Sequence, residues 1–277
     1  ASDVYKRQTM NRSEIFLVMV SGMGTIAGSV MGTYIGMLGG TDPAAKVLFA
    51  THLLSASVMA VPGSIVLAKM LCPQTEEATD HVAISGKEKE NSNILDAISS
   101  GTVTGVKLMT NIAAMLLVFI SLVALANYIT EGVIGRYTGL NDWIVKITDG
   151  KAQGLTFQFI LGVITSPFMW LIGVPSQDIM LVGSLLGQKT ILNEFVAYFQ
   201  LQQWKDAGLF MYEKSILMST YILCGFANIS SIGILLGGLG VLAPEKRGLI
   251  SRIGVPAMIG GALVSVLSAT IIGMILG

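Results

Sequence analysis

Five apolar stretches, each long enough to cross a lipid bilayer, constrain this chain more than any other feature. A membrane-spanning helix needs about 20 mostly apolar residues, and five stretches meet this length: 14–39, 46–71, 105–128, 214–242 and 253–276. Only 12% of the 277 residues are charged, whereas soluble domains carry about a quarter. The sequence therefore predicts an all-α polytopic membrane protein.

Two shorter apolar arms predict a different kind of element. Residues 155–174 and 179–187 are apolar but are separated by Pro175 and Asp178. The second arm is too short to span the membrane. Short arms around a proline-containing tip are typical of a re-entrant hairpin, which is stable only where protein or a water-filled cavity covers its backbone. We expect such a hairpin over 154–194, with Asp178 as a cap or loop residue.

Two of the long stretches are interrupted near their middle. The segment GTIAGSV (24–30) interrupts the first, and FANISSIG (226–233) interrupts the fourth. Lys and Arg near the span ends, among them Lys87, Lys89 and Arg247, place the connections that carry them in the cytoplasm. The two interrupted stretches then run in opposite directions. Interrupted segments of opposite direction are typical of inverted-repeat transporters, whose sites lie at broken transmembrane helices.

The second interruption and the hairpin carry candidate binding residues. Asn228 and Ser231 are three positions apart and share one face of a helix. Glu194 directly follows the short apolar arm, and a carboxylate at membrane depth is by default a functional hypothesis. Glu accepts from two hydroxyls, and Asn both donates and accepts, so the set matches a sugar. The alternatives are a structural pair between Glu194 and Lys189, and hydrogen bonds that join packed helices.

Two further positions concern an apolar wall and a cation. Phe226, close to Asn228, supplies an apolar or stacking surface. Thr25 and the backbone around it offer hydroxyl and carbonyl oxygens to a small hard cation; the alternative is a Thr25 that bonds only its own helix. With zero net charge, nothing favours nucleic-acid binding. We expect no cofactor and no enzyme activity, because no histidine or nucleophile motif lies near Glu194 in the sequence.

Four segments together resemble the concentrative nucleoside transporter family. They are GTIAGSVMGTYI, HLLSASVMAVPGSIVLAKML, LLGQKTILNEFVAYFQL and GFANISSIGILLGGLGVLAPEKR. The resemblance implies a secondary active transporter that imports nucleosides such as uridine with Na⁺ or H⁺. It also implies an elevator-type mechanism, a homotrimer and a location in the bacterial inner membrane. The alternative function is a membrane gate or scaffold component that transports nothing.

The same resemblance implies roles for individual residues. Glu194, Asn228 and Ser231 match ribose contacts, and Phe226 lines the same pocket. Val30 matches an apolar contact to the nucleobase.

For the coupling ion, the resemblance implies two ligands. The Thr25 side chain and the Ile26 carbonyl match ligands of sodium in sodium-coupled members of the family.

The resemblance also orders the chain into regions. We expect a non-native or junction leader, a gate-like transmembrane pair of the first repeat, a cytoplasmic loop with an interfacial helix, a scaffold helix, and the carboxyl-terminal transporter region. These cover residues 1–9, 10–71, 72–104, 105–128 and 129–277, respectively. In the family another hairpin precedes the segment that matches GTIAGSV. Nothing before Met10 matches it, so we expect the carboxyl-terminal two-thirds of a transporter.

Overall fold

The structure is a computed structural model that describes residues 10–76, 94–148, 150, 152–242 and 244–277. Every regular element in these ranges is a helix. The chain divides into two compact units, the smaller formed mainly by 80–157 and the larger by 6–79 with 158–277. The expected leader 1–9 and residues 77–93 of the expected loop lie outside the described residues.

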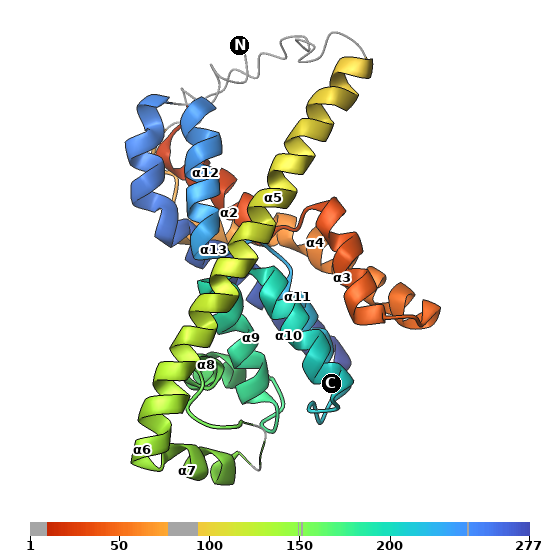
Figure 1. The fold of residues 1–277 in the computed structure, drawn as a ribbon. Coiled ribbons are helices and arrows are strands. Elements are labelled where there is room, and N and C mark those ends of the chain that lie inside the picture. Colours follow the sequence, from red (N-terminus) through yellow and green to blue (C-terminus); the bar gives the residue numbers. More distant parts are fainter. Residues whose placement is uncertain (1–9, 77–93, 149, 151, 243) are drawn as a thin grey trace. The chain divides into compact units, whose positions relative to one another are not determined.

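The larger unit carries both interrupted helices (Figure 1). Its first helices are α2 (Arg12–Gly24), α3 (Gly28–Gly39) and α4 (Pro43–Leu71). The later ones are α8 (Phe157–Leu171), α9 (Ile179–Ile191), α10 (Glu194–Asp206), α11 (Glu213–Leu223), α12 (Ile229–Leu242), η2 (Pro244–Lys246) and α13 (Arg247–Leu276).

The smaller unit differs from the expected arrangement. We expected an interfacial helix within 72–104 and a separate scaffold span at 105–128, but α5 (Ile94–Asn127) is one helix of 34 residues. No proline falls between 94 and 127 to interrupt its backbone hydrogen bonds. The chain continues as η1 (Tyr128–Gly135), a π-helix, then α6 (Arg136–Thr138) and α7 (Leu140–Ile147).

Both interrupted stretches are broken into two short helices. The first becomes α2, of 13 residues, and α3, of 12. The fourth becomes α11, of 11 residues, and α12, of 14. None of these halves is long enough to cross a bilayer alone, since a span needs about 20 residues.

Two helices in the described part of the chain are long and apolar enough to cross a membrane. They are Pro43–Leu71 and Pro244–Leu276, the second combining η2 with α13. We expected five continuous spans, and the two interrupted ones differ from that count because each is divided at its polar middle. Val58, Val61 and Ile65 project from α4 as exposed apolar side chains, as lipid contact requires.

Helix α13 packs against α2, α4, α11 and α12. Close approach depends on its glycines: a Cβ at Gly261 would lie 2.7 Å from the Met23 Cβ, and one at Gly254 would lie 2.7 Å from Ile232 Cγ2. Small residues at helix contacts let backbones approach each other in membrane proteins. Helix α13 therefore supports both broken helices.

Helices α8 and α9 form the expected hairpin, with a connection at 172–178. Glycines again bring them together, because a Cβ at Gly187 would lie 2.6 Å from the Leu161 Cβ. The Asp178 carboxylate does not cap α9. It is fully buried and accepts hydrogen bonds from the backbone N–H groups of Met211, at 3.0 and 3.2 Å, and Tyr212, at 3.1 Å. It thus ties the hairpin tip to the start of α11; re-entrance into a membrane remains a prediction.

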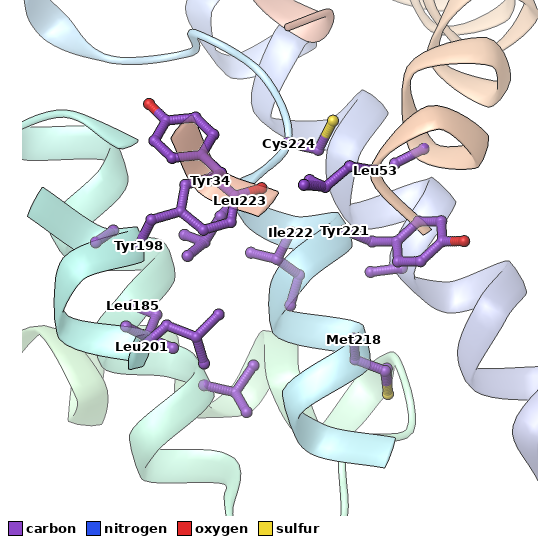
Figure 2. Packing of buried hydrophobic residues seen from close by; sticks show 14 of the residues in the cluster. Tyr34, Leu53, Leu185, Tyr198, Leu201, Met218, Tyr221, Ile222, Leu223 and Cys224 are labelled. Carbon is purple, nitrogen blue, oxygen red and sulfur yellow. The ribbon is translucent and has the colours of Figure 1, made fainter. Parts of the chain in front are cut away.

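One buried apolar cluster surrounds the end of α11. Tyr34 of α3 stacks on Tyr198 of α10, with ring centroids 4.0 Å apart. Figure 2 shows these two rings on one side of the end of α11 and Tyr221 on the other. The Tyr221 hydroxyl and His52 Nδ1 are 3.1 Å apart, within hydrogen-bond distance. The cluster therefore fixes α3, α4 and α10 around the second helix break.

Candidate functional site

The two helix breaks meet at Gly225. Its backbone φ is +131°, a conformation that residues with a side chain rarely adopt. A Cβ at this position would lie 2.9 Å from the carbonyl oxygens of Met23 and Gly24, at the end of α2. Only glycine allows this contact, which brings the first break (25–27) against the second (224–228). Sequence elements about 200 positions apart, by the numbering of the printed chain, thus form one polar region.

Glu194 and Asn228 form the centre of the candidate site. Asn228 Nδ2 donates a hydrogen bond of 2.9 Å to Glu194 Oε2. The side chains are almost fully buried, with Glu194 6% exposed and Asn228 2%. The alternative pair of Glu194 with Lys189 is not formed, because no ion pair joins them in the described structure. The carboxylate is instead bonded to the amide of the other interrupted segment.

The amide oxygen of Asn228 holds the start of α12. It accepts from the Ser231 backbone N–H at 2.9 Å, from Ser231 Oγ at 3.0 Å and from Ser230 Oγ at 2.6 Å. The first of these bonds is the one that a helix N-cap side chain makes. Asn228 therefore has two tasks: its oxygen ends the break and begins the helix, while its nitrogen holds Glu194.

A second cap places Glu194. Asn193 precedes α10, and its side chain accepts from the Val196 N–H at 2.9 Å. Glu194 is consequently the first residue of α10, and α12 starts directly after Asn228. Two helix amino termini, which carry partial positive charge, converge on the carboxylate. This arrangement suits a ligand with hydroxyl groups that share the carboxylate and the amide.

The apolar residues predicted for the site lie in one cluster. Val30 and Phe226 are partly buried and pack against the cluster that contains Tyr34 and Leu223. Val30 lies one helical turn before Tyr34 on α3. The structure thus brings the predicted nucleobase contact and the predicted pocket wall to the same packed region.

Thr25 and Ile26 lie in the first break. The Thr25 hydroxyl donates to the Ser21 carbonyl at 2.9 Å, so it bonds its own helix. A hydroxyl that donates its proton keeps its oxygen lone pairs, and ligation of a cation through this oxygen is compatible with the bond. Ile26 is 7% exposed. Among the described residues, no group of three His, Cys, Asp or Glu could hold a metal ion.

Two polar residues near this site were not predicted from the sequence. The Tyr34 hydroxyl is buried without a hydrogen-bond partner and interacts electrostatically with Glu194. Lys189 is fully buried at the end of α9. An ionisable residue in an apolar arm is a functional signal, and Lys189 was considered only as a partner for Glu194. For Tyr34, an aromatic residue in a glycine-rich run, the sequence offers no comparable signal.

Crossed broken helices with a buried polar centre define an inverted-repeat membrane transporter. Comparison with known proteins gives the family. Residues 52–273 match the family model described as Na⁺ dependent nucleoside transporter C-terminus. The chain belongs to this family.

Similar proteins occur in bacteria and mammals. The chain is 39% identical over 273 residues to an uncharacterized transporter of Haemophilus influenzae, covering 98% of this chain and 60% of that protein. It is 36% identical to the nucleoside permease NupC of Helicobacter pylori, covering 98% and 59%. It is 38% identical to sodium/nucleoside cotransporter 1 of Rattus norvegicus, covering 96% and 40%. The chain thus spans about 60% of these bacterial relatives.

Solved structures show the same fold. The chain matches CNTnw in an inward-facing substrate-bound state with a TM-score of 0.80 and 34% identity, covering 100% of this chain and 60% of that one. It matches a variant of CNTnw in an outward-facing state with a TM-score of 0.81 and 35% identity, covering 99% and 60%. The all-helical transporter fold predicted from the sequence is confirmed.

Proposed function

We propose that this chain forms the carboxyl-terminal part of a transporter that imports nucleosides together with Na⁺ or H⁺. The observation that carries the proposal is the buried bond between Asn228 and Glu194 at the meeting point of two helix breaks. Relatives with the same arrangement of segments include a protein named nucleoside permease and one named sodium/nucleoside cotransporter.

The chemistry of the site favours the ribose part of a nucleoside. Glu194 accepts from a pair of vicinal hydroxyls, and Asn228 and Ser231 complete their hydrogen bonds. In a buried site, a ligand that lacks these hydroxyls leaves the polar groups without partners, which disfavours it strongly. Phe226 and Val30 supply the apolar surface against which a nucleobase packs. Uridine is the representative substrate.

Coupling follows from the position of the first break. A cation bound by the Thr25 hydroxyl and the Ile26 carbonyl lies in the segment next to Gly225 and thus next to the substrate break. The cation then favours substrate binding, and substrate favours the cation equally, because linkage is reciprocal. We place the protein in the bacterial inner membrane as a homotrimer.

The division into two units supports an elevator mechanism. All predicted binding residues belong to the larger unit, and α5 belongs to the smaller one. In the mechanism that we propose, the larger unit moves with its substrate while α5 belongs to the fixed scaffold. The alternative, a gate or scaffold component without transport, requires that no nucleoside bind.

A thermal-stability assay on the purified complete transporter tests the proposed substrate class. Uridine at 100 times its dissociation constant stabilises the folded state by about 2.7 kcal/mol, which raises the melting temperature. We expect 2′,3′-dideoxyuridine at the same concentration to give little stabilisation, because it lacks the hydroxyls that Glu194 would bind. Equal stabilisation by both compounds would contradict the ribose assignment, and none by either would contradict the proposed function.

A further inference from the structure

Lys189 is a buried cation that the proposed binding site does not use. It lies in the last turn of α9, is 0% exposed and is among the largest fully buried side chains. No carboxylate in the described residues lies within ion-pair distance of its ammonium group. An unpaired charge inside a protein is costly, and an intramembrane charge commonly marks function. The contacts of this side chain therefore require an explanation.

The Lys189 ammonium joins three helices. Nζ donates to the Ile222 carbonyl of α11 at 2.7 Å and to Ser265 Oγ of α13 at 2.8 Å. Ser265 in turn donates to the Ala262 carbonyl at 2.8 Å, so its oxygen is oriented to accept. The charge is thus stabilised by carbonyl and hydroxyl dipoles, which are also the groups that bind small hard cations.

The bond to Ile222 falls at the end of α11, just before the second break. The last carbonyls of a helix lack partners within it and carry partial negative charge. Here the Thr220 carbonyl accepts from the Tyr198 hydroxyl at 2.9 Å, and that of Tyr221 from the Cys224 N–H at 3.1 Å. Lys189 supplies the partner for the third. Since α11 has no basic residue in its own last turn, α9 provides the cation.

The first break has the corresponding geometry without such a side chain. Helix α2 also ends at a break and also lacks a basic residue in its last turn. Thr25 and Ile26, the proposed ligands of the free coupling cation, follow directly. The two breaks therefore differ in one respect: the charge at the second is covalently attached to the protein.

We propose that Lys189 is a tethered cation at the second break, where it positions Asn228 against Glu194. Lys189 lies five residues before Glu194, across the short connection between α9 and α10. Its bond to Ile222 fixes this connection relative to the chain that leads to Asn228. Lys189 is thus a positioning residue, and free cation is needed only at the first break. This inference rests on the proposed function.

Substitution Lys189→Met in the complete transporter tests the positioning role. Replacing a buried charge by an apolar side chain of similar volume is often neutral or stabilising, so we expect an unchanged or higher melting temperature. We expect the dissociation constant for uridine, measured by calorimetry, to rise about 10-fold or more, as coupled neighbouring sites allow. A lower melting temperature with unchanged uridine affinity would overturn the proposal and indicate a purely structural residue.

Lys205→Met is the matched control. Lys205 also donates to a carbonyl in the last turn of a broken-helix half, that of Leu38 in α3, but it is partly exposed and far in sequence from both breaks. We expect its uridine affinity to stay within about twofold of wild type. If wild type itself binds no uridine, the proposed function fails; if wild type and both variants bind equally, only the role of Lys189 fails.

Substitution Lys189→Ala tests the charge itself, because it leaves space for a small cation. We expect ethylammonium to restore part of the lost uridine affinity and ethanol, its neutral analogue, to restore none. Restoration by both compounds, or by neither in a folded variant, would overturn the tethered-cation proposal.

Discussion

At the scale of single residues, Asn228 connects structure and binding. Its oxygen begins α12 and its nitrogen holds Glu194, so substitution affects both the helix start and the carboxylate. The sequence was sufficient to select Glu194, Asn228 and Ser231, because polar residues stand out in apolar stretches. It could not reveal how they pair, since Glu194 reaches an amide 34 positions away rather than its neighbour Lys189.

The two serines after Asn228 allow a matched comparison. Ser231 is 5% exposed and is proposed to contact ribose, whereas Ser230 is only partly buried and has no such role. We expect Ser231→Ala to weaken uridine binding about 10-fold, the effect of losing roughly 1.4 kcal/mol. Ser230→Ala should change it by less than about threefold. Calorimetric titration measures both, and a larger effect for Ser230→Ala would refute this assignment.

At the scale of helices, polar and glycine-rich interruptions in the sequence predicted two broken helices. That prediction depended on local signals, since glycine and hydroxyl residues stand where an apolar span would otherwise continue. The meeting of the breaks was not predictable, because it depends on a positive φ at Gly225 and on long-range contact with α2. The continuity of α5 was also missed: its polar first turns resemble an interfacial helix, but a helix continues where nothing ends it.

Gly225→Ala tests the crossing of the breaks. A Cβ there would require an unfavourable backbone conformation and would clash with two carbonyl oxygens at 2.9 Å. We expect a loss of about 2 kcal/mol or more in stability, seen as a lower melting temperature. Gly237→Ala in α12 is the control, because no atom lies within 4 Å of its Cβ position. Similar melting temperatures for the two variants would show that the breaks do not need this close contact.

At the scale of the whole molecule, the chain supplies both broken helices and one hairpin of a transporter. It spans 60% of the CNTnw chain in the substrate-bound structure, so activity belongs to the complete protein. Composition was sufficient to predict the membrane class, because few charged residues are available to face water. The choice between Na⁺ and H⁺ cannot be made from Thr25 and Ile26, since hydroxyl and carbonyl oxygens permit sodium without requiring it.

Uridine uptake by cells that express the complete transporter tests the central claim most directly. Wild type, Glu194→Ala and Glu213→Ala are compared at equal expression with and without sodium. Glu213 is the matched control because it is also the first residue of its helix, α11, but is exposed. We expect Glu194→Ala to lower uptake about 100-fold, through loss of two hydrogen bonds to a charged group, and Glu213→Ala to leave it unchanged. Uptake that follows a proton gradient instead of sodium would identify the ion as H⁺. Equal uptake by wild type and Glu194→Ala would contradict the account.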